Sequence, residues 1–297
     1  MDTVANVIRA AGAREATTAE PVDTVARRRA LRWIGVYVAL SGLALVLAHD
    51  FAIAALHLLL LGVVAWAATS ERRLGRVVGD VAPLIIAVAL YGEIPRLIAV
   101  VGTSYHDATI QHLDLWVFGT EPAKAFASAL PFAWLSEPLH AGYMLFYPMI
   151  FVPPLLLYVR GERRGFSETI FVLTATWIAC WVCFIVFPVE GPRYLWGPST
   201  AAPDGPMRRL AVAILAAGSS RGAAFPSSHM AVSVAQTLLA LKWQRRVGVA
   251  CVVVSVLVGL GAVYGGFHYG VDMIAGALVG GAVALAIQLF RAEKQLA

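Results

Sequence analysis

Long apolar runs alternate with short polar segments along most of this chain. A helix needs about 20 apolar residues to cross the roughly 30 Å hydrocarbon core of a bilayer. The chain contains eight runs near this length, although Glu93, Pro95 and Arg96 interrupt the third and the sixth is short. We therefore predict an all-α, polytopic bundle of about eight transmembrane helices. The predicted spans are 31–48, 51–69, 77–95, 138–159, 167–188, 226–242, 247–265 and 268–290.

Two segments fall outside this pattern. Residues 1–26 are polar and lack the apolar stretch of a signal peptide, so we expect a mobile tail or a short surface helix there. A longer polar segment, 96–137, separates the third and fourth spans. Its middle, 110–118, mixes Leu, Trp and Phe with His112 and Asp114, which is typical of a helix that lies in the membrane interface.

The composition supports a membrane protein. Of the 297 residues, 59% are hydrophobic and 14% are charged, and the mean hydropathy is +0.74. A soluble domain usually carries about 25% charged residues. These values exclude a disordered chain and argue against an ordinary soluble domain. The formal net charge of +5 does not require a nucleic-acid partner, because basic residues of membrane proteins gather in cytoplasmic loops.

The distribution of basic residues predicts the topology. With the N-terminus in the cytoplasm, 17 of the 23 Lys and Arg residues fall on the cytoplasmic side and six on the other side. Every cytoplasmic loop is then basic, as the positive-inside rule requires. We expect a multi-pass protein of the plasma (inner) membrane with both termini in the cytoplasm.

Some polar residues inside the apolar runs stand alone. His57 in the second span has no partner that the sequence reveals, and we interpret it as a packed or interface histidine. Cys180, Cys183 and Cys251 lie in apolar surroundings, so we interpret them as packing residues rather than as a metal or redox site.

Three polar clusters instead gather at the ends of spans. In the first, Pro and Gly residues end the fifth span and place Arg193 near the interface. The second opens the sixth span with Ser227, Ser228 and His229, close after Arg221. Either serine can cap the helix, and the unpaired N–H groups of a helix start attract phosphate.

The third cluster opens the eighth span. His268 and Asp272 are four residues apart, so they share one helix face. A carboxylate that holds one imidazole nitrogen makes the other a better nucleophile. On the predicted topology all three clusters lie on the side opposite to the cytoplasm. Two histidines, an aspartate, arginines and a helix start suit phosphoryl transfer, and we expect neither a metal site nor a cofactor.

These motifs resemble those of the type 2 phosphatidic acid phosphatase superfamily. The stretch 225–229, Phe-Pro-Ser-Ser-His, resembles the P-S-G-H motif, and 268–272 resembles the H-x-x-x-D that ends the third motif. The stretch 190–193, Glu-Gly-Pro-Arg, resembles the end of the first motif. The segment 114–119 is similar to the branch that includes inositol phosphorylceramide synthases. The resemblance covers roughly residues 95 to 290.

The resemblance implies a domain organisation. The superfamily fold is a six-helix bundle, so the first two spans are expected to be accessory. The expected parts are a polar cytoplasmic tail at 1–30, two accessory transmembrane helices at 31–76, and a six-helix phosphatase or phosphotransferase core at 77–297 that includes the outer segment 96–137.

The resemblance also implies roles for individual residues. His268 is expected to be the nucleophile that forms a phosphohistidine, Asp272 to orient it, and His229 to act as general acid. Two cations of the superfamily are missing, because Val186 and Ala262 occupy their positions. We expect Arg221 to replace one of them. The residues expected to bind phosphate are Arg193, Ser227, Ser228 and Arg221.

We therefore expect a membrane lipid phosphatase that acts on a lipid phosphate or pyrophosphate at the extracytoplasmic face. One alternative is a phospholipid head-group phosphotransferase resembling inositol phosphorylceramide synthase, and an alternative of another class is a non-enzymatic lipid transporter. The expected partners are the lipid phosphate and membrane lipids, without nucleic acid, and the sequence leaves the oligomeric state open. Acidic residues of the outer segment, including Asp107 and Asp114, are expected to shape the head-group pocket. Further candidates for that pocket are Tyr194, Glu137, Tyr143 and Tyr147.

Overall fold

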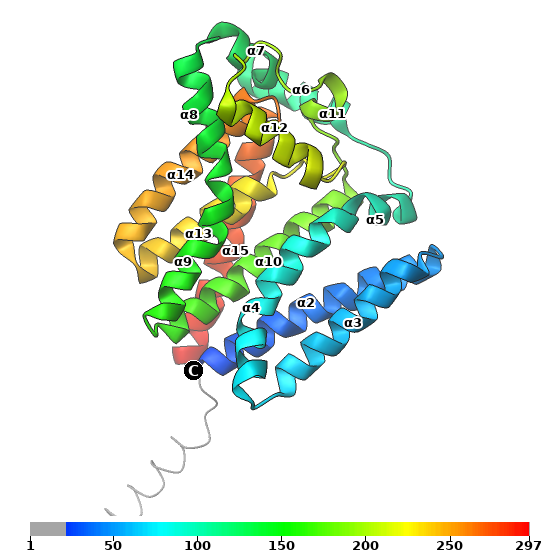
Figure 1. The fold of residues 1–297 in the computed structure, drawn as a ribbon, viewed down its shortest axis with the longest axis vertical. Coiled ribbons are helices and arrows are strands. Elements are labelled where there is room, and N and C mark those ends of the chain that lie inside the picture. Colours follow the sequence, from blue (N-terminus) through cyan, green and yellow to red (C-terminus); the bar gives the residue numbers. More distant parts are fainter. Residues whose placement is uncertain (1–21, 297) are drawn as a thin grey trace, which may run out of the picture.

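The protein is a bundle of helices, which confirms the predicted fold class (Figure 1). A computed structural model describes residues 22–296, and among these the regular elements are all helical. The predicted N-terminal tail lies outside the described residues up to residue 21, and from Val22 on its residues belong to a helix. The helices are α2 (Val22–Leu47), α3 (Phe51–Thr69), α4 (Arg73–Leu90), the 3₁₀ turn η1 (Tyr91–Glu93), α5 (Ile94–Val101), α6 (Asp107–Phe118), α7 (Pro122–Ala129), α8 (Ala133–Met144), α9 (Phe146–Val159), α10 (Arg163–Val186), α11 (Pro192–Trp196), α12 (Pro206–Gly218), α13 (Ser228–Trp243), α14 (Arg245–Tyr264) and α15 (Gly270–Leu296).

Most of the predicted spans have the length that a membrane requires. In the described residues six helical stretches are long and apolar enough to cross, and α8 with α9, bent by 44°, makes a seventh. The bend lies just before Pro148, whose ring removes a backbone N–H and clashes with the preceding turn. The eighth predicted span, α13, has 16 residues, or about 24 Å at 1.5 Å per residue. The predicted number of about eight spans thus includes one helix shorter than a full crossing.

The third span is longer than its sequence predicts. The residues Glu93, Pro95 and Arg96 do not end it, because the chain passes through η1 into α5 and forms one apolar stretch, Arg73–Val101. Pro95 lies in the first turn of α5, where a missing backbone N–H leaves no hydrogen bond unmade.

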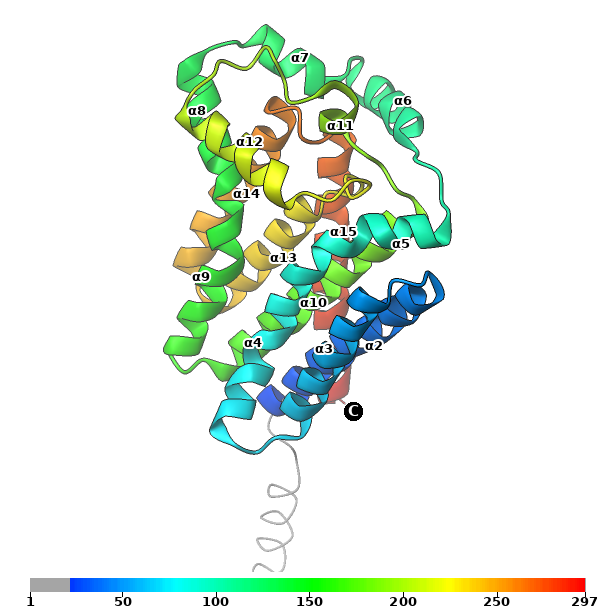
Figure 2. The same cartoon turned by 45° about the vertical axis from the view of Figure 1, so that its right-hand side comes forward.

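The two ends of the bundle differ in structure. In both views α6, α7, α11 and α12 gather at the upper end, whereas the α3–α4 turn, the α9–α10 turn and the C-terminal helix end lie at the lower end (Figures 1 and 2). The lower turns carry the basic residues Arg72, Arg73, Arg160 and Arg163. The chain therefore has a basic end and an opposite end where short helices cover the bundle.

The helix predicted at 110–118 is α6, and one of its sides is apolar and exposed. Trp116 is 83% exposed, and Leu115 and Phe118 are 46% and 43% exposed. Such a face suits the membrane interface, where aromatic side chains are favoured.

Helices α2 and α3 form a hairpin that packs against α4 and α10. His57 on α3 is buried as expected, but it does not stand alone, because its Nε2 lies 2.9 Å from the Glu93 carboxylate in η1. This contact links the hairpin to the helix that leads to the upper end of the bundle. The sequence could not reveal it, since 36 residues separate the partners along the chain.

Candidate active site

Helix α13 begins inside the bundle rather than at its surface. The hydroxyl of Ser227 caps the helix by accepting a hydrogen bond from the Met230 N–H at 3.3 Å. The Ser227 N–H donates to the carbonyl of Asp272 at 3.0 Å and so ties α13 to α15. Gly276 permits this approach, because a Cβ there would lie 2.4 Å from the Ser227 carbonyl oxygen. His229 is thereby held in the first turn of α13 and is buried.

Residues 268–272 place an imidazole beside a carboxylate. The Nδ1 of His268 lies 3.2 Å from Oδ2 of Asp272, and the Tyr269 N–H donates to the same oxygen at 2.9 Å. The contact predicted from the four-residue spacing is therefore present. Because a carboxylate accepts the Nδ1 proton, the lone pair of the neutral His268 ring is on Nε2.

The two histidines face each other in one cavity. The ring centroids of His229 and His268 are 5.7 Å apart, and both rings line a cavity that Arg193 also lines. The Tyr143 hydroxyl lies 3.3 Å from Nε2 of His229. Reacting atoms approach to about 3–3.5 Å before bond formation, so this separation suits two groups that act on one phosphorus atom. Among the described residues no group of three or more His, Cys, Asp or Glu side chains is placed to hold a metal ion.

Helix α6 holds the loop that follows α10. The carboxylate of Asp107 accepts hydrogen bonds from the N–H groups of Glu190 and Gly191, each at 2.9 Å, and from the Tyr269 hydroxyl at 3.0 Å. Burial raises the pKa of Tyr269, which therefore stays protonated and donates. Gly191 has a φ of +91°, a backbone conformation that side chains disfavour. These contacts fix the turn that presents Arg193.

Helix α6 also holds the start of α15. Asp114 accepts hydrogen bonds from the N–H groups of Gly270 and Val271 at 3.1 and 2.8 Å, and it is fully buried. A carboxylate at the start of a helix accepts hydrogen bonds from backbone N–H groups that lack partners within the helix, and it interacts favourably with the positive end of the helix dipole. Burial raises the pKa of Asp114, and these two backbone donors oppose the rise.

Asp107 and Asp114, which were expected to shape a head-group pocket, do not line the cavity. Their oxygens are directed to backbone N–H groups instead, because those buried donors need acceptors. One signal was present in the sequence. The two residues are seven apart, on one face of a helix, and their partners include Gly191 just before α11 and Gly270 at the start of α15.

The first two motif loops are joined to each other. The Val189 N–H donates to the Gly222 carbonyl at 3.1 Å, and the Ala224 N–H donates to the Val189 carbonyl at 3.0 Å. Gly222 has a φ of +90° and leaves no space for a side chain, since a Cβ would lie 2.4 Å from Ile98. The loops that carry Arg193 and His229 are therefore parts of one rigid unit.

The two arginines of the site differ in position. Arg193 on α11 lines the cavity, donates to the Ser219 hydroxyl and lies 4.6 Å from the Tyr194 ring centroid. Arg221 does not line the cavity and instead pairs with Glu190, whose carboxylate does. Arg221 thus reaches the site only through Glu190, which sequence reasoning did not assign.

The remaining predicted residues divide between the cavity wall and its surroundings. The tyrosines expected in a substrate pocket, Tyr143, Tyr147 and Tyr194, line the cavity. Ser227 and Ser228 are buried behind the wall, one as the cap of α13 and the other with an unpartnered hydroxyl. The cavity residues that sequence reasoning missed are Val88, Tyr91, Phe146, Ile150, Phe151, Trp177, Glu190, Leu215, Gly218, Ser219, Ser220, Ala223, Ala224 and Phe267.

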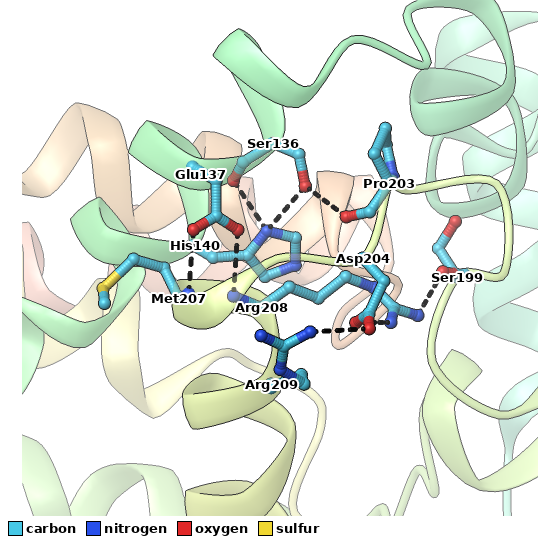
Figure 3. A network of polar contacts seen from close by, with 9 residues as sticks. All are labelled: Ser136, Glu137, His140, Ser199, Pro203, Asp204, Met207, Arg208 and Arg209. Carbon is cyan, nitrogen blue, oxygen red and sulfur yellow. Dashed lines mark hydrogen bonds and ion pairs between the residues drawn. The ribbon is translucent and has the colours of Figure 1, made fainter.

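Glu137 lies outside the cavity. Its carboxylate accepts hydrogen bonds from the N–H groups of Met207 and Arg208 at 2.9 and 3.4 Å and so caps the start of α12 (Figure 3). Beside it, Asp204 pairs with Arg208 and Arg209, and their guanidinium groups hold the pKa of Asp204 below its usual value. The carboxylate of Glu137, expected in a head-group pocket, is therefore engaged by the start of α12 and not by the cavity.

The fold and the cavity define a helical membrane protein with a histidine-lined site near one end of the bundle. A family model of the PAP2 superfamily matches residues 109–286, which is more than half of the 297-residue chain. The chain belongs to the PAP2 superfamily, and this membership supports an enzyme with phosphatase-type activity. The match includes all three motifs and leaves out α2 to α5. Neither the curated proteins nor the solved structures contain a match.

Proposed function

We propose that this protein cleaves a phosphate ester of a membrane lipid through a covalent intermediate on His268. The observation that carries the proposal is the pair of imidazoles, 5.7 Å apart, in a cavity that also contains a guanidinium group. In the first step Nε2 of His268 attacks phosphorus, the bond to the leaving oxygen breaks, and His229 protonates that oxygen. Water then attacks the phosphohistidine, and His229 accepts its proton.

Several groups are placed to stabilise the phosphoryl oxygens. Arg193 supplies a fixed positive charge, and the Ser219 hydroxyl that it contacts lines the same wall. His229 lies in the first turn of α13, so the positive end of that helix dipole is directed to the site. Donors fixed in advance cost no reorganisation when charge develops in the transition state.

The apolar part of the cavity supports a lipid as substrate. Val88 on α4 and Phe151 on α9 line the cavity and are each 41% exposed, so the wall reaches the outer surface of the bundle. A lipid chain can lie between these helices while its phosphate reaches the histidines. The basic turns at the opposite end favour a site on the extracytoplasmic side.

A mass-spectrometric assay tests this proposal. Purified protein is incubated with a phosphorylated lipid, quenched at alkaline pH to preserve phosphohistidine, and digested. We expect phosphate on His268 and loss of at least about 1000-fold in turnover for His268→Ala. His112→Ala removes an exposed histidine of α6 and is the matched control. Turnover by His268→Ala at the rate of the control disproves the proposal.

A head-group phosphotransferase is a second candidate, favoured by a polar hollow beside the catalytic loops. The residues that line the hollow include Lys124, Ser199, Thr200 and Gly266. The Nζ of Lys124 lies 3.5 Å from the centroid of Trp196, which also lines the hollow. Hydroxyl groups beside an aromatic ring suit a polar alcohol. Addition of inositol or glycerol to the assay is then expected to yield the phosphorylated alcohol, whereas a phosphatase releases only inorganic phosphate.

A further inference from the structure

A groove on the flank of the bundle is separate from the cavity of the two histidines. Residues of α2 and α15 form its walls, and residues of α10, against which both helices pack, form its floor. None of the described residues that line the groove also lines the cavity. In both views the start of α2 and the end of α15 lie near each other at the lower, basic end of the bundle (Figures 1 and 2).

Small side chains on α10 and α15 leave the groove open. Ala175 and Ala179 are one turn apart on the floor, and Ala286 lines the wall on α15. Phe171 and Val182 line the groove at two points that are 11 residues apart on α10, or about 16 Å at 1.5 Å per residue. Half of a hydrocarbon core of about 30 Å is about 15 Å. The groove therefore has the length of one leaflet of a membrane.

Two arginines without counter-ions line the groove near the basic end. Arg29 and Arg32 are three residues apart on α2, so they share a face of the helix. Among the described residues no carboxylate pairs with either of them, whereas the nearby Arg27 pairs with Asp80. Trp33 follows them in the groove and is 47% exposed, as is common for Trp at a membrane interface. Guanidinium groups are well suited to bind phosphate, because each presents a planar set of N–H donors.

We infer that this groove binds an anionic phospholipid, with its phosphate on Arg29 and Arg32 and an acyl chain along the floor of α10. Charge complementarity selects this occupant, since an anionic lipid supplies the negative charge that the two arginines lack, whereas a zwitterionic lipid also brings a cation to them. Basic pockets between transmembrane helices bind anionic head groups in this way. The bound lipid contacts α2 and α15 together and so ties the hairpin of α2 and α3 to the rest of the bundle.

The groove binds this lipid without changing it. Among the described residues that line the groove there is no histidine, cysteine, serine or carboxylate that could act as nucleophile or base. The site is therefore independent of the reaction proposed for the histidine cavity.

Two lipids with the same acyl chains test the inference. The full chain, purified in detergent, is titrated with dioleoyl phosphatidylglycerol or dioleoyl phosphatidylcholine, and native mass spectrometry counts the lipids that stay bound. We expect one molecule of phosphatidylglycerol to bind at least about 10-fold more tightly than phosphatidylcholine. Equal binding of the two lipids overturns the inference.

A pair of charge variants assigns the preference to the groove. In Arg29→Gln/Arg32→Gln the preference for phosphatidylglycerol is expected to disappear. Arg72→Gln/Arg73→Gln removes two exposed arginines at the same end of the bundle, outside the groove, and is the matched control that keeps the preference. Because neither pair lines the histidine cavity, lipid bound there contributes equally to both variants. A preference that persists in Arg29→Gln/Arg32→Gln contradicts the inference.

A steric variant tests the apolar part of the groove. Ala179→Phe fills the floor and leaves both arginines in place, so phosphatidylglycerol is expected to bind at least about 10-fold more weakly. Ala55→Phe adds the same side chain at an exposed position of α3, outside the groove, and is the control. Since the bound lipid is counted on ions of folded protein, partial unfolding does not affect the comparison. Unchanged binding in Ala179→Phe overturns the inference, as does a lipid-free dimer that Ala179→Phe dissociates, because a second copy of the chain then occupies the groove.

Discussion

The contact between His57 and Glu93 predicts that replacing one partner lowers stability by a large amount, whereas replacing both lowers it much less. Both side chains are nearly inaccessible, at 3% and 6%, and His57 Nε2 lies 2.9 Å from the carboxylate. The other ring nitrogen, Nδ1, lies 2.9 Å from the Ile53 carbonyl, which can only accept, so Nδ1 carries a proton. One further proton lies between the imidazole and the carboxylate. The pair is then neutral as a whole, whichever partner holds that proton.

Breaking this pair on one side leaves a buried polar group without its partner. At 2.9 Å, two unit charges attract by about 6 kcal/mol for an effective dielectric of 20, and desolvation offsets part of this. Removing one partner of a buried pair typically costs about 3–5 kcal/mol. We expect this loss in the free energy of unfolding for His57→Leu. The double variant His57→Leu/Glu93→Met replaces both groups by apolar ones and is expected to recover most of the loss.

Unfolding of the purified protein in mixed micelles with increasing SDS, followed by tryptophan fluorescence, measures these values. Arg96→Gln is the control, because Arg96 and Asp50 form a pair near the same helix end with 54% and 33% exposed side chains. An exposed pair contributes about 0–1 kcal/mol. If His57→Leu costs no more than Arg96→Gln, or if the double variant costs the sum of its single variants, the reasoning is refuted.

Three further predictions concern the site and its supports. Arg221→Ala leaves Glu190 unpaired beside the phosphate, so turnover of the phosphorylated lipid is expected to fall at least about 10-fold. Adding Glu190→Gln to this variant is expected to restore most of the turnover, and no recovery contradicts the indirect role of Arg221. Burial raises the pKa of Asp114 above its ordinary 3.8, so the folded state binds the carboxyl proton more tightly than the unfolded state, and stability falls as pH rises from 3.8 through the raised pKa. In unfolding curves measured over a pH series, Asp114→Asn is expected to flatten the fall of stability in this pH range. An unchanged slope argues against the raised pKa of Asp114. Glu137→Ala removes the cap of α12 and is expected to cost about 0.5–2 kcal/mol in SDS unfolding with kcat nearly unchanged, whereas a selective loss of kcat supports a direct role.

The local features of the site follow from sequence spacing alone. Residues four apart in a helix share a face, so the contact of His268 with Asp272 was predictable, and the polar start of α13 predicted a capped helix. The long apolar runs likewise predicted the helical bundle. These features depend on interactions within one turn of helix or on the thickness of a membrane, and neither requires knowledge of distant neighbours.

Tertiary packing decided which polar groups meet. The sequence reveals that Asp107, Asp114 and Glu137 are acidic, but only the fold directs them to backbone N–H groups that lie 70 or more residues away. The same applies to His57 and Glu93, which belong to different helices. A buried donor or acceptor takes the partner that packing brings within hydrogen-bond distance, and the order of residues along one chain does not encode that distance directly.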